Sequence, residues 1–115
     1  MLALLLLAQA APAAPAPSPA QADARCIVAF GSMAGSDTEE VQRAAQLGAL
    51  YFYGKLLGRE PAVDLKAAMT AAATAVTANV RPELLRCGTE LQRSGEALRA
   101  VGQALQNDPP AADKK

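Results

Sequence analysis

The chain has 115 residues, no net charge, and neither histidine nor tryptophan. Its 11 basic residues are interleaved with 11 acidic ones, which argues against a nucleic-acid partner and against electrostatic docking on anionic lipid, because both need clustered positive charge. The absence of histidine removes the commonest general base and the commonest zinc ligand. The composition therefore leaves room for one small domain and offers little for catalysis.

The first 18 residues are typical of an export signal followed by a spacer. Residues 2–8 form a short apolar run, and the Ala-Gln-Ala of residues 8–10 fits the small-x-small cleavage pattern. We expect a signal peptide over residues 1–10, cleaved after Ala10, and an Ala/Pro-rich spacer over residues 11–18. The run is far shorter than the roughly 20 residues that span a bilayer, so no stable membrane insertion is expected after signal removal. These features predict a periplasmic or secreted protein; the alternative is a disordered tail on a cytosolic protein.

A capping pattern predicts the first helix. Ser18 and Gln21 form a capping box around Pro19, a residue favoured at the first helical position. We expect a short helix that ends at Gly35, because glycine favours the C-terminal cap. The residues on its apolar face are Cys26, Ala29, Phe30 and Met33.

A second capping box, Ser36 with Glu39, predicts the second helix, which is expected to run to Leu57 and stop at Gly58. Its central apolar positions are Val41, Ala45, Gly48, Phe52 and Leu56, with Leu47, Leu50, Tyr51 and Tyr53 widening the face. Successive helical residues point about 100° apart, so the middle member of the aromatic run is expected in the core and the two tyrosines at its edges.

Proline positions separate the third and fourth helices from their neighbours. Pro61 marks the connection to a third helix over residues 65–76, which Asp64 is expected to cap. Alanine and threonine dominate this helix and offer little area to bury, so we expect it to be the least stable. The last helix is expected to start at Asn79, with Pro82 in its first turn.

Residues 81–106 carry three stripes on one face of this last helix. Leucine recurs every seven residues, and a second row and a glycine row lie beside it. The rows are Leu84, Leu91, Leu98 and Leu105; Cys87, Ser94 and Val101; and Gly88, Gly95 and Gly102. Each interior glycine costs about 1 kcal/mol relative to alanine, so we expect a close neighbour on this face.

The stripes favour an interpretation of the last helix as the central helix of a monomeric bundle. The glycine row would then pack on a helix of the same chain, most naturally the second, which has Gly48 and Gly54. The alternative is a homodimer or a partner helix, because the leucine heptads also resemble a short coiled-coil seam. Outside the stripes, the glutamates and arginines from Glu83 to Arg99 are expected to form a solvated, salt-paired face.

The two cysteines predict a structural disulfide. Cys26 lies in the first predicted helix and Cys87 in the last, which is the pattern of a covalent staple in an exported protein. The alternative is a redox-active pair, but such pairs normally have Cys-x-x-Cys spacing. Two sulfur ligands without histidine make a zinc site improbable, so no metal and no cofactor is expected.

No catalytic constellation is recognisable, because the chain has neither a Gly-x-Ser-x-Gly elbow nor a glycine-rich phosphate loop after a strand. The candidate interaction surface comprises Tyr51, Tyr53, Gly88, Gly95 and Gly102. For the tyrosines, a role at the edge of the core is the competing interpretation.

Three segments, DARCIVAFGSMAG (23–35), AAQLGALYFYGKLLGR (44–59) and LLRCGTELQRSGEALRAVGQALQ (84–106), resemble small uncharacterised exported helical proteins of alphaproteobacteria. That resemblance implies no activity. VTANVRPELLRC (76–87) is similar to the segment before the second cysteine in the acid-stress chaperones of the bacterial periplasm, which are small, helical and held by one disulfide. The cysteine spacing here is longer, tryptophan is missing and lysine is scarce, so no binding residue is carried over.

The sequence thus predicts an all-α, disulfide-stapled bundle of about four helices over residues 19–106, with a disordered tail over residues 107–115. We expect a non-enzymatic exported protein that binds a protein partner or client, in a stress-protective, chaperone-like role. The alternatives are a structural homo-oligomer, in the simplest case a homodimer, that uses the glycine row, and a thiol redox protein.

Overall fold

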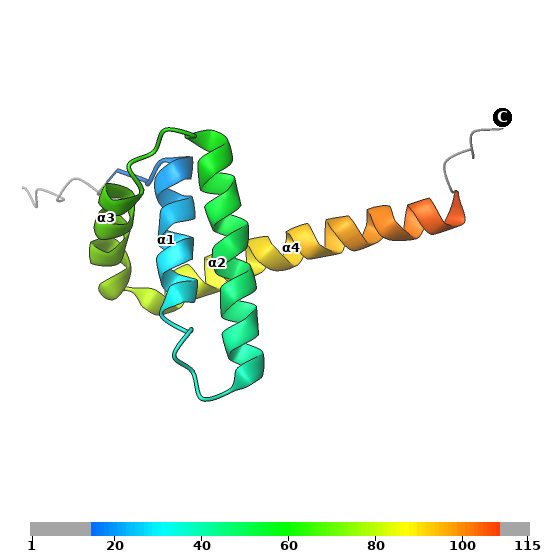
Figure 1. Ribbon diagram of the computed structural model, residues 1–115, viewed down its shortest axis with the longest axis horizontal. Coiled ribbons are helices and arrows are strands. Elements are labelled where there is room, and N and C mark those ends of the chain that lie inside the picture. Colours follow the sequence, from blue (N-terminus) through cyan, green and yellow to red (C-terminus); the bar gives the residue numbers. More distant parts are fainter. Residues whose placement is uncertain (1–14, 109–115) are drawn as a thin grey trace, which may run out of the picture.

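The computed structural model describes residues 15–108, which form four helices and no strand (Figure 1). The helices are α1 (Pro19–Gly31), α2 (Glu39–Arg59), α3 (Leu65–Thr77) and α4 (Val80–Asn107). The predicted all-α fold is confirmed. The predicted signal peptide, the spacer up to residue 14 and the tail beyond residue 108 lie outside the described residues.

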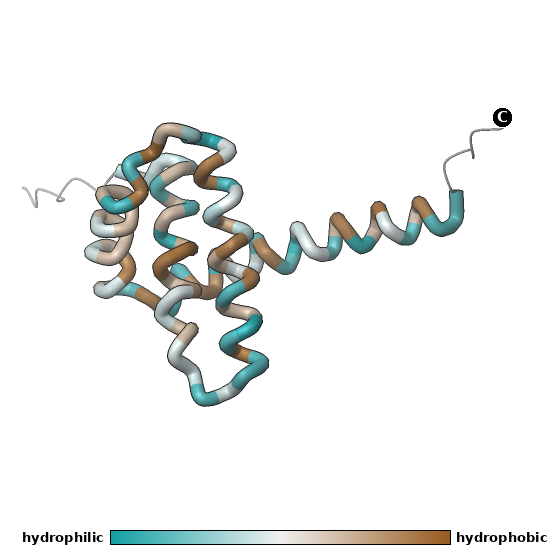
Figure 2. The backbone as a smooth tube through the Cα atoms, in the orientation of Figure 1, coloured by the Kyte–Doolittle hydropathy of each residue, from teal (hydrophilic) through white to brown (hydrophobic). Residues whose placement is uncertain are grey.

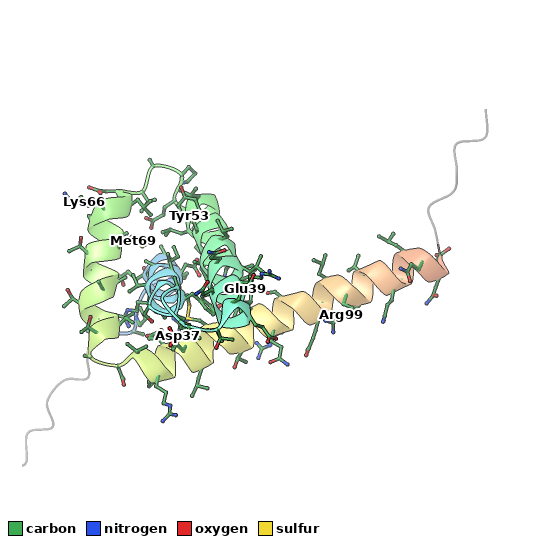
Figure 3. All side chains as sticks on the ribbon, turned by 60° about the horizontal axis from the view of Figure 1, so that its bottom comes forward. Asp37, Glu39, Tyr53, Lys66, Met69 and Arg99 are labelled. Atoms are coloured by element: carbon green, nitrogen blue, oxygen red, sulfur yellow. A yellow bond between two sulfur atoms is a disulfide. The ribbon has the colours of Figure 1, made fainter. Side chains whose placement is uncertain are left out.

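The central helix of the fold is α1. Its contacts with α2 and α3 are by far the most extensive between helices, whereas α4 touches each of the other three helices only slightly and the backbones of α2 and α3 do not approach one another. Figure 1 shows α1 between α3 and α2, and Figure 3 shows the same layer from another side, with α4 crossing it and extending away. The prediction that the last helix is central is therefore wrong.

The capping box of α1 is confirmed in both directions. The Gln21 amide N–H donates to Ser18 Oγ at 3.2 Å, and the Ser18 N–H donates to Gln21 Oε1 at 2.9 Å. The helix ends at Gly31, four residues before the predicted glycine cap. Ser32 follows the last helical residue, and its hydroxyl donates to the Ala29 carbonyl at 2.6 Å, so a side chain satisfies a carbonyl at the helix end.

The second predicted capping box does not form. Helix α2 begins at Glu39 with Thr38 at the N-cap position, and no side chain caps it. Ser36 Oγ instead accepts from the Thr38 N–H at 3.3 Å, and the Ser36 carbonyl accepts from the Gln42 side chain at 2.5 Å. At the other end α2 runs to Arg59, one residue past the predicted stop.

The starts of α3 and α4 agree with the sequence in position. Asp64 caps α3 by accepting from the Ala67 N–H at 3.0 Å, as predicted. Asn79 stands at the N-cap position of α4, but its side chain makes no capping hydrogen bond. The first turn of α4 contains Pro82, which a helix tolerates there because the first N–H groups have no intrahelical partner.

The core consists of two clusters that share α1 and α2. The first joins α1, α2 and α4 through Cys26, Phe30, Phe52 and Cys87. The second joins α1, α2 and α3 through Ala24, Leu56 and Ala72. The second cluster is built largely from small side chains, so its helices are held together by less apolar area than those of the first.

The predicted buried face of α2 is too wide. Ala45, Gly48, Phe52 and Leu56 are buried as expected. Leu47 and Leu50, which were expected to widen this face, are 66% and 65% exposed. The reason is that α1 covers only the side of α2 on which the buried stripe lies.

Gly48 of α2 lies so close to the ring of Phe30 of α1 that there is no room for a side chain. A Cβ added there would lie 2.7–2.8 Å from three ring atoms of Phe30, whereas at Gly95 it would meet nothing within 4 Å. We expect Gly48→Ala to destabilise the protein by about 1 kcal/mol despite the better helix propensity of alanine, because the ring must shift. Gly95→Ala, the matched control, should stabilise the monomer by about 0.5–1 kcal/mol. Urea unfolding followed by circular dichroism measures both, and equal signs for the two changes would contradict the expectation.

Candidate functional site

Helix α4 is packed along its first half only. Leu84 and Leu91 pack against the first core cluster, and Cys87 is fully buried within it. Ser94 is the last half-buried residue of α4, and every later residue of the helix is exposed. From residue 95 onward α4 leaves the other helices, as Figure 1 shows.

Residues 95–107, here called the α4 arm, expose an apolar stripe. The side chains of Leu98, Val101 and Leu105 are 73%, 56% and 54% exposed. Leu98 and Leu105 continue the seven-residue row of Leu84 and Leu91, and Val101 continues the neighbouring row of Cys87 and Ser94. Figure 2 shows hydrophobic residues recurring along the arm. Thirteen helical residues are about 20 Å long, so the stripe is of substantial length.

The glycine row does not pack against α2. At Gly88, Gly95 and Gly102, an added Cβ would meet nothing within 4 Å, and the same holds at Gly54 of α2. The interpretation in which the row packs on the second helix of the same chain is therefore wrong. The close helix contact at Gly48 is made by a side chain of α1 instead.

The two candidate tyrosines lie in different environments. The hydroxyls of Tyr51 and Ser94 are hydrogen-bonded at 2.6 Å, and the Tyr51 ring packs edge-on against Phe52 at 4.8 Å between ring centres. Tyr53 is 38% exposed, and two residues on a helix point about 200° apart, so it faces away from Tyr51. The structure thus brings Tyr51, but not Tyr53, to the packed residues 87–94 of α4, here called the root of the α4 arm.

The predicted disulfide is confirmed. Cys26 of α1 and Cys87 of α4 are bonded, with 5.5 Å between their Cα atoms, and both residues are fully buried. The bond therefore ties the root of α4 to the central helix. A disulfide of this kind is typical of an oxidising compartment outside the cytoplasm.

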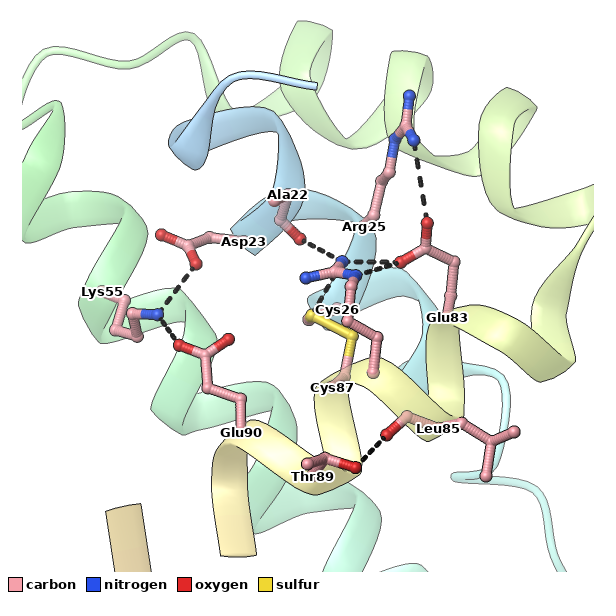
Figure 4. Close-up of a disulfide and its surroundings, with 11 residues drawn as sticks. Ala22, Asp23, Arg25, Cys26, Lys55, Glu83, Leu85, Cys87, Thr89 and Glu90 are labelled. Carbon is pink, nitrogen blue, oxygen red and sulfur yellow. Dashed lines mark hydrogen bonds and ion pairs between the residues drawn. A yellow bond between two sulfur atoms is a disulfide. The ribbon is translucent and has the colours of Figure 1, made fainter. Parts of the chain in front are cut away.

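A charged cluster that sequence reasoning missed lies beside the disulfide (Figure 4). Asp23 is 3% exposed and accepts from Lys55 Nζ at 3.2 Å and from Arg59 Nε at 2.7 Å. Lys55 also pairs with Glu90. Burial of Lys55 alone would lower its pKa, but its hydrogen bonds to Glu90 and Asp23 raise the pKa above 10.5 overall. The cluster links α1, α2 and α4 at the root of the arm.

A second charged group borders the disulfide on its other side. Arg86 Nη2 donates to the Ala22 carbonyl at 3.2 Å and lies 3.3 Å from the Cys26 sulfur. Glu83 pairs with Arg86 at 2.6 Å and with Arg25 of α1 at 3.7 Å (Figure 4). The expectation that the glutamates and arginines of the last helix form only a solvated face is thus wrong for Glu83, Arg86 and Glu90, which contact other helices. The signal available in the sequence was Asp23, an acidic residue one turn from Cys26 on the buried side of α1.

A shallow hollow of about 280 Å³ lies between α1, α3 and the end of α2. Its floor includes Ala24, Leu56 and Ala72, and Arg25 and Glu60 contribute to its lining. The alanines leave this space open because they are too short to fill it. The chemistry of the hollow suits a small apolar group, with both signs of charge nearby.

The fold and the arm define a class: a small disulfide-stapled helical protein with one projecting helix. No protein-family model matches the chain, and neither a curated protein nor a solved structure is significantly similar to it. Within residues 15–108, no helix is long and apolar enough to cross a membrane. The same part of the chain holds no group of three or more histidine, cysteine, aspartate or glutamate residues arranged to bind a metal ion.

Proposed function

We propose that this is an exported, non-enzymatic protein that binds other polypeptides through the α4 arm. The observation that supports this most strongly is the exposure of Leu98, Val101 and Leu105 on one helical stripe. Contiguous exposed apolar surface on a small protein is typical of an interaction site, because it costs free energy in water until a partner covers it. A helix laid against an apolar stripe is a common mode of peptide recognition.

The root of the arm is built to hold its direction. The disulfide, the Lys55–Glu90 pair and the Tyr51–Ser94 hydrogen bond all attach α4 before residue 95. An isolated helix of about 13 residues is marginal in water, so the packed first half of α4 supports the helical state of the arm. A stripe that is pre-ordered in this way loses less conformational entropy on binding.

The signal-like pattern of residues 1–10 and the disulfide support export to the periplasm or to the outside of the cell. In that setting a stress-protective role amounts to shielding the apolar segments of unfolding clients. A thiol redox role has less support, because both sulfurs are buried and reactive cysteines are accessible.

We expect the purified protein to reduce the light scattering of a heat-denatured model enzyme, such as citrate synthase, at pH 7, and of an acid-denatured client near pH 3. Replacing Leu98 and Leu105 with lysine, which is charged at both pH values, should remove most of this protection, because charged side chains cannot cover an apolar client segment. Gln92→Lys with Gln103→Lys is the matched control, since it adds the same charge on the opposite side of α4. Full protection by the Leu98/Leu105 variant at both pH values would contradict the proposal.

A further inference from the structure

The packing face of the α4 arm carries no charge. Its positions between 94 and 105 are Ser94, Gly95, Ala97, Leu98, Val101, Gly102, Ala104 and Leu105. The charged residues Arg93, Glu96 and Arg99 lie on the other sides of the helix, about 100° or more from the centre of the stripe. A partner surface that matches this face must itself be uncharged. Anionic lipid fits less well, because interfacial helices are rich in lysine and arginine on the polar face, whereas here only Arg93 and Arg99 lie there, with Glu96 between them.

Small residues border the stripe on both sides. Gly95 and Gly102 lie along one edge, and Ala97 and Ala104 along the other. Neither glycine has a neighbour in the chain that would explain its cost in helix propensity. Small residues at the edges of the stripe offer little area for a lipid surface to cover, but they allow the backbone of another helix to approach closely. The partner that suits the arm is therefore a helix with an uncharged apolar ridge and small neighbours.

The α4 arm is itself a helix with an uncharged apolar ridge and small residues on both sides of it. Resting on the proposed function, we propose that its partner is the arm of a second copy of the chain, bound in antiparallel orientation. A register that places Leu98 opposite Val101 of the partner subunit also places Leu105 opposite Ser94 of the partner subunit. Each arm of about 20 Å then covers the whole of the other, because the tip of one reaches the root of its partner.

The orientation follows from the position of the stripe. The arm continues the same face of α4 that packs on α1 and α2, so a parallel partner would meet those helices at the root. An antiparallel partner brings only its tip there. Leu47 is 66% exposed and lies one turn before Tyr51 on the same side of α2, and Tyr51 is hydrogen-bonded to Ser94 at the start of the arm. It gives the arriving tip a further apolar contact.

The contact between two arms is small compared with the interfaces of stable dimers, so we expect a dissociation constant in the micromolar range. Sedimentation velocity over roughly 5 to 200 µM should show the wild type passing from monomer to dimer. Leu98→Lys alone and Val101→Glu alone should each weaken self-association at least tenfold, because each leaves a charge in an apolar seam. Gln92→Lys with Gln103→Glu is the matched control on the outward face, and it should dimerise like the wild type.

Mixing the two single variants tests the register. In the antiparallel arrangement Lys at position 98 of one chain meets Glu at position 101 of the other, and the second Leu98–Val101 contact of the pair stays apolar. The equimolar mixture should therefore regain a dimer that neither variant forms alone. In a parallel seam residue 98 faces residue 98 of the other chain and residue 101 faces residue 101, so each introduced charge would face an apolar side chain. A mixture that stays monomeric overturns the proposed register. A wild type that stays monomeric up to the highest concentration overturns the second-copy inference.

The two proposals fail in different ways. A monomeric wild type whose client protection still depends on Leu98 and Leu105 removes the second copy as partner and leaves the binding function standing. If neither self-association nor client protection responds to these substitutions, both proposals are removed. Circular dichroism and urea unfolding of each variant confirm that the fold is retained, as expected for substitutions at exposed positions.

Discussion

Removing the disulfide by replacing Cys26 and Cys87 with alanine is expected to lower the free energy of unfolding by about 4 kcal/mol. The bond joins residues 61 positions apart, so its loss frees a large closed loop in the unfolded chain. Both sulfurs are also fully buried beside Phe30 and Phe52, and their removal leaves a small gap in the first core cluster. A domain this small has a total stability of the same order, so the variant should be largely unfolded at 37 °C.

Urea unfolding at 25 °C, followed by far-ultraviolet circular dichroism, measures this loss. The wild type under reducing conditions is the companion sample, because it loses the cross-link and keeps the sulfur atoms. We expect it to lose slightly less stability than the double alanine variant. A loss below about 1 kcal/mol in both samples would show that the packed helices hold α4 without the bond.

Replacing Asp23 with asparagine is expected to cost about 3 kcal/mol of stability. Asparagine keeps the size of the side chain but removes the charge that faces Lys55 and Arg59. The Asp23 side chain is 4% exposed, so water cannot take the place of the lost negative charge beside Lys55 and Arg59. The loss should exceed that of a surface pair because the cluster connects three helices beside the disulfide.

Glu39→Gln is the matched control for this prediction. It breaks the exposed pair between Glu39 and Arg43, whose side chains are 76% and 73% exposed, and should cost less than about 0.5 kcal/mol.

The stability of the two proteins at alkaline pH is a further test of the Asp23–Lys55 pair. The pKa of Lys55 is raised on folding, so the stability that its ion pairs contribute is present below pH 10.5 and is lost as the pH rises through the folded-state pKa. The wild type should therefore lose more stability than Asp23→Asn above pH 10.5, and identical alkaline profiles would contradict the assignment.

The helices could be predicted because their boundaries depend on local chemistry. Ser18, Asp64 and Pro82 act within three or four residues of their own positions, and each stands where the sequence placed it. The failure at Ser36 is also local: its hydroxyl accepts from the Thr38 backbone N–H and its carbonyl from the Gln42 side chain, so the hydroxyl does not cap the helix. The disulfide was predictable for a simpler reason: a chain with two cysteines allows one pairing.

The charged cluster could not be predicted from spacing rules. Those rules concern residues three or four apart on one helix, whereas Asp23, Lys55 and Glu90 lie on three helices. Their meeting depends on how α2 and α4 cross α1. The same holds for Tyr51, whose hydrogen bond to Ser94 joins residues 43 positions apart.

The sequence by itself determined that the protein is helical, that one disulfide joins its first helix to its last, and that α4 has one apolar face with glycines beside it. Periodicity identifies which side of a helix is apolar, but it does not identify what covers that side. Only the tertiary structure decided that point. Helix α1 is about 20 Å long and α4 about 42 Å, and helices that cross at an angle touch over a short distance. The stripe is therefore covered as far as Leu91 and left exposed from Leu98 onward, within the α4 arm.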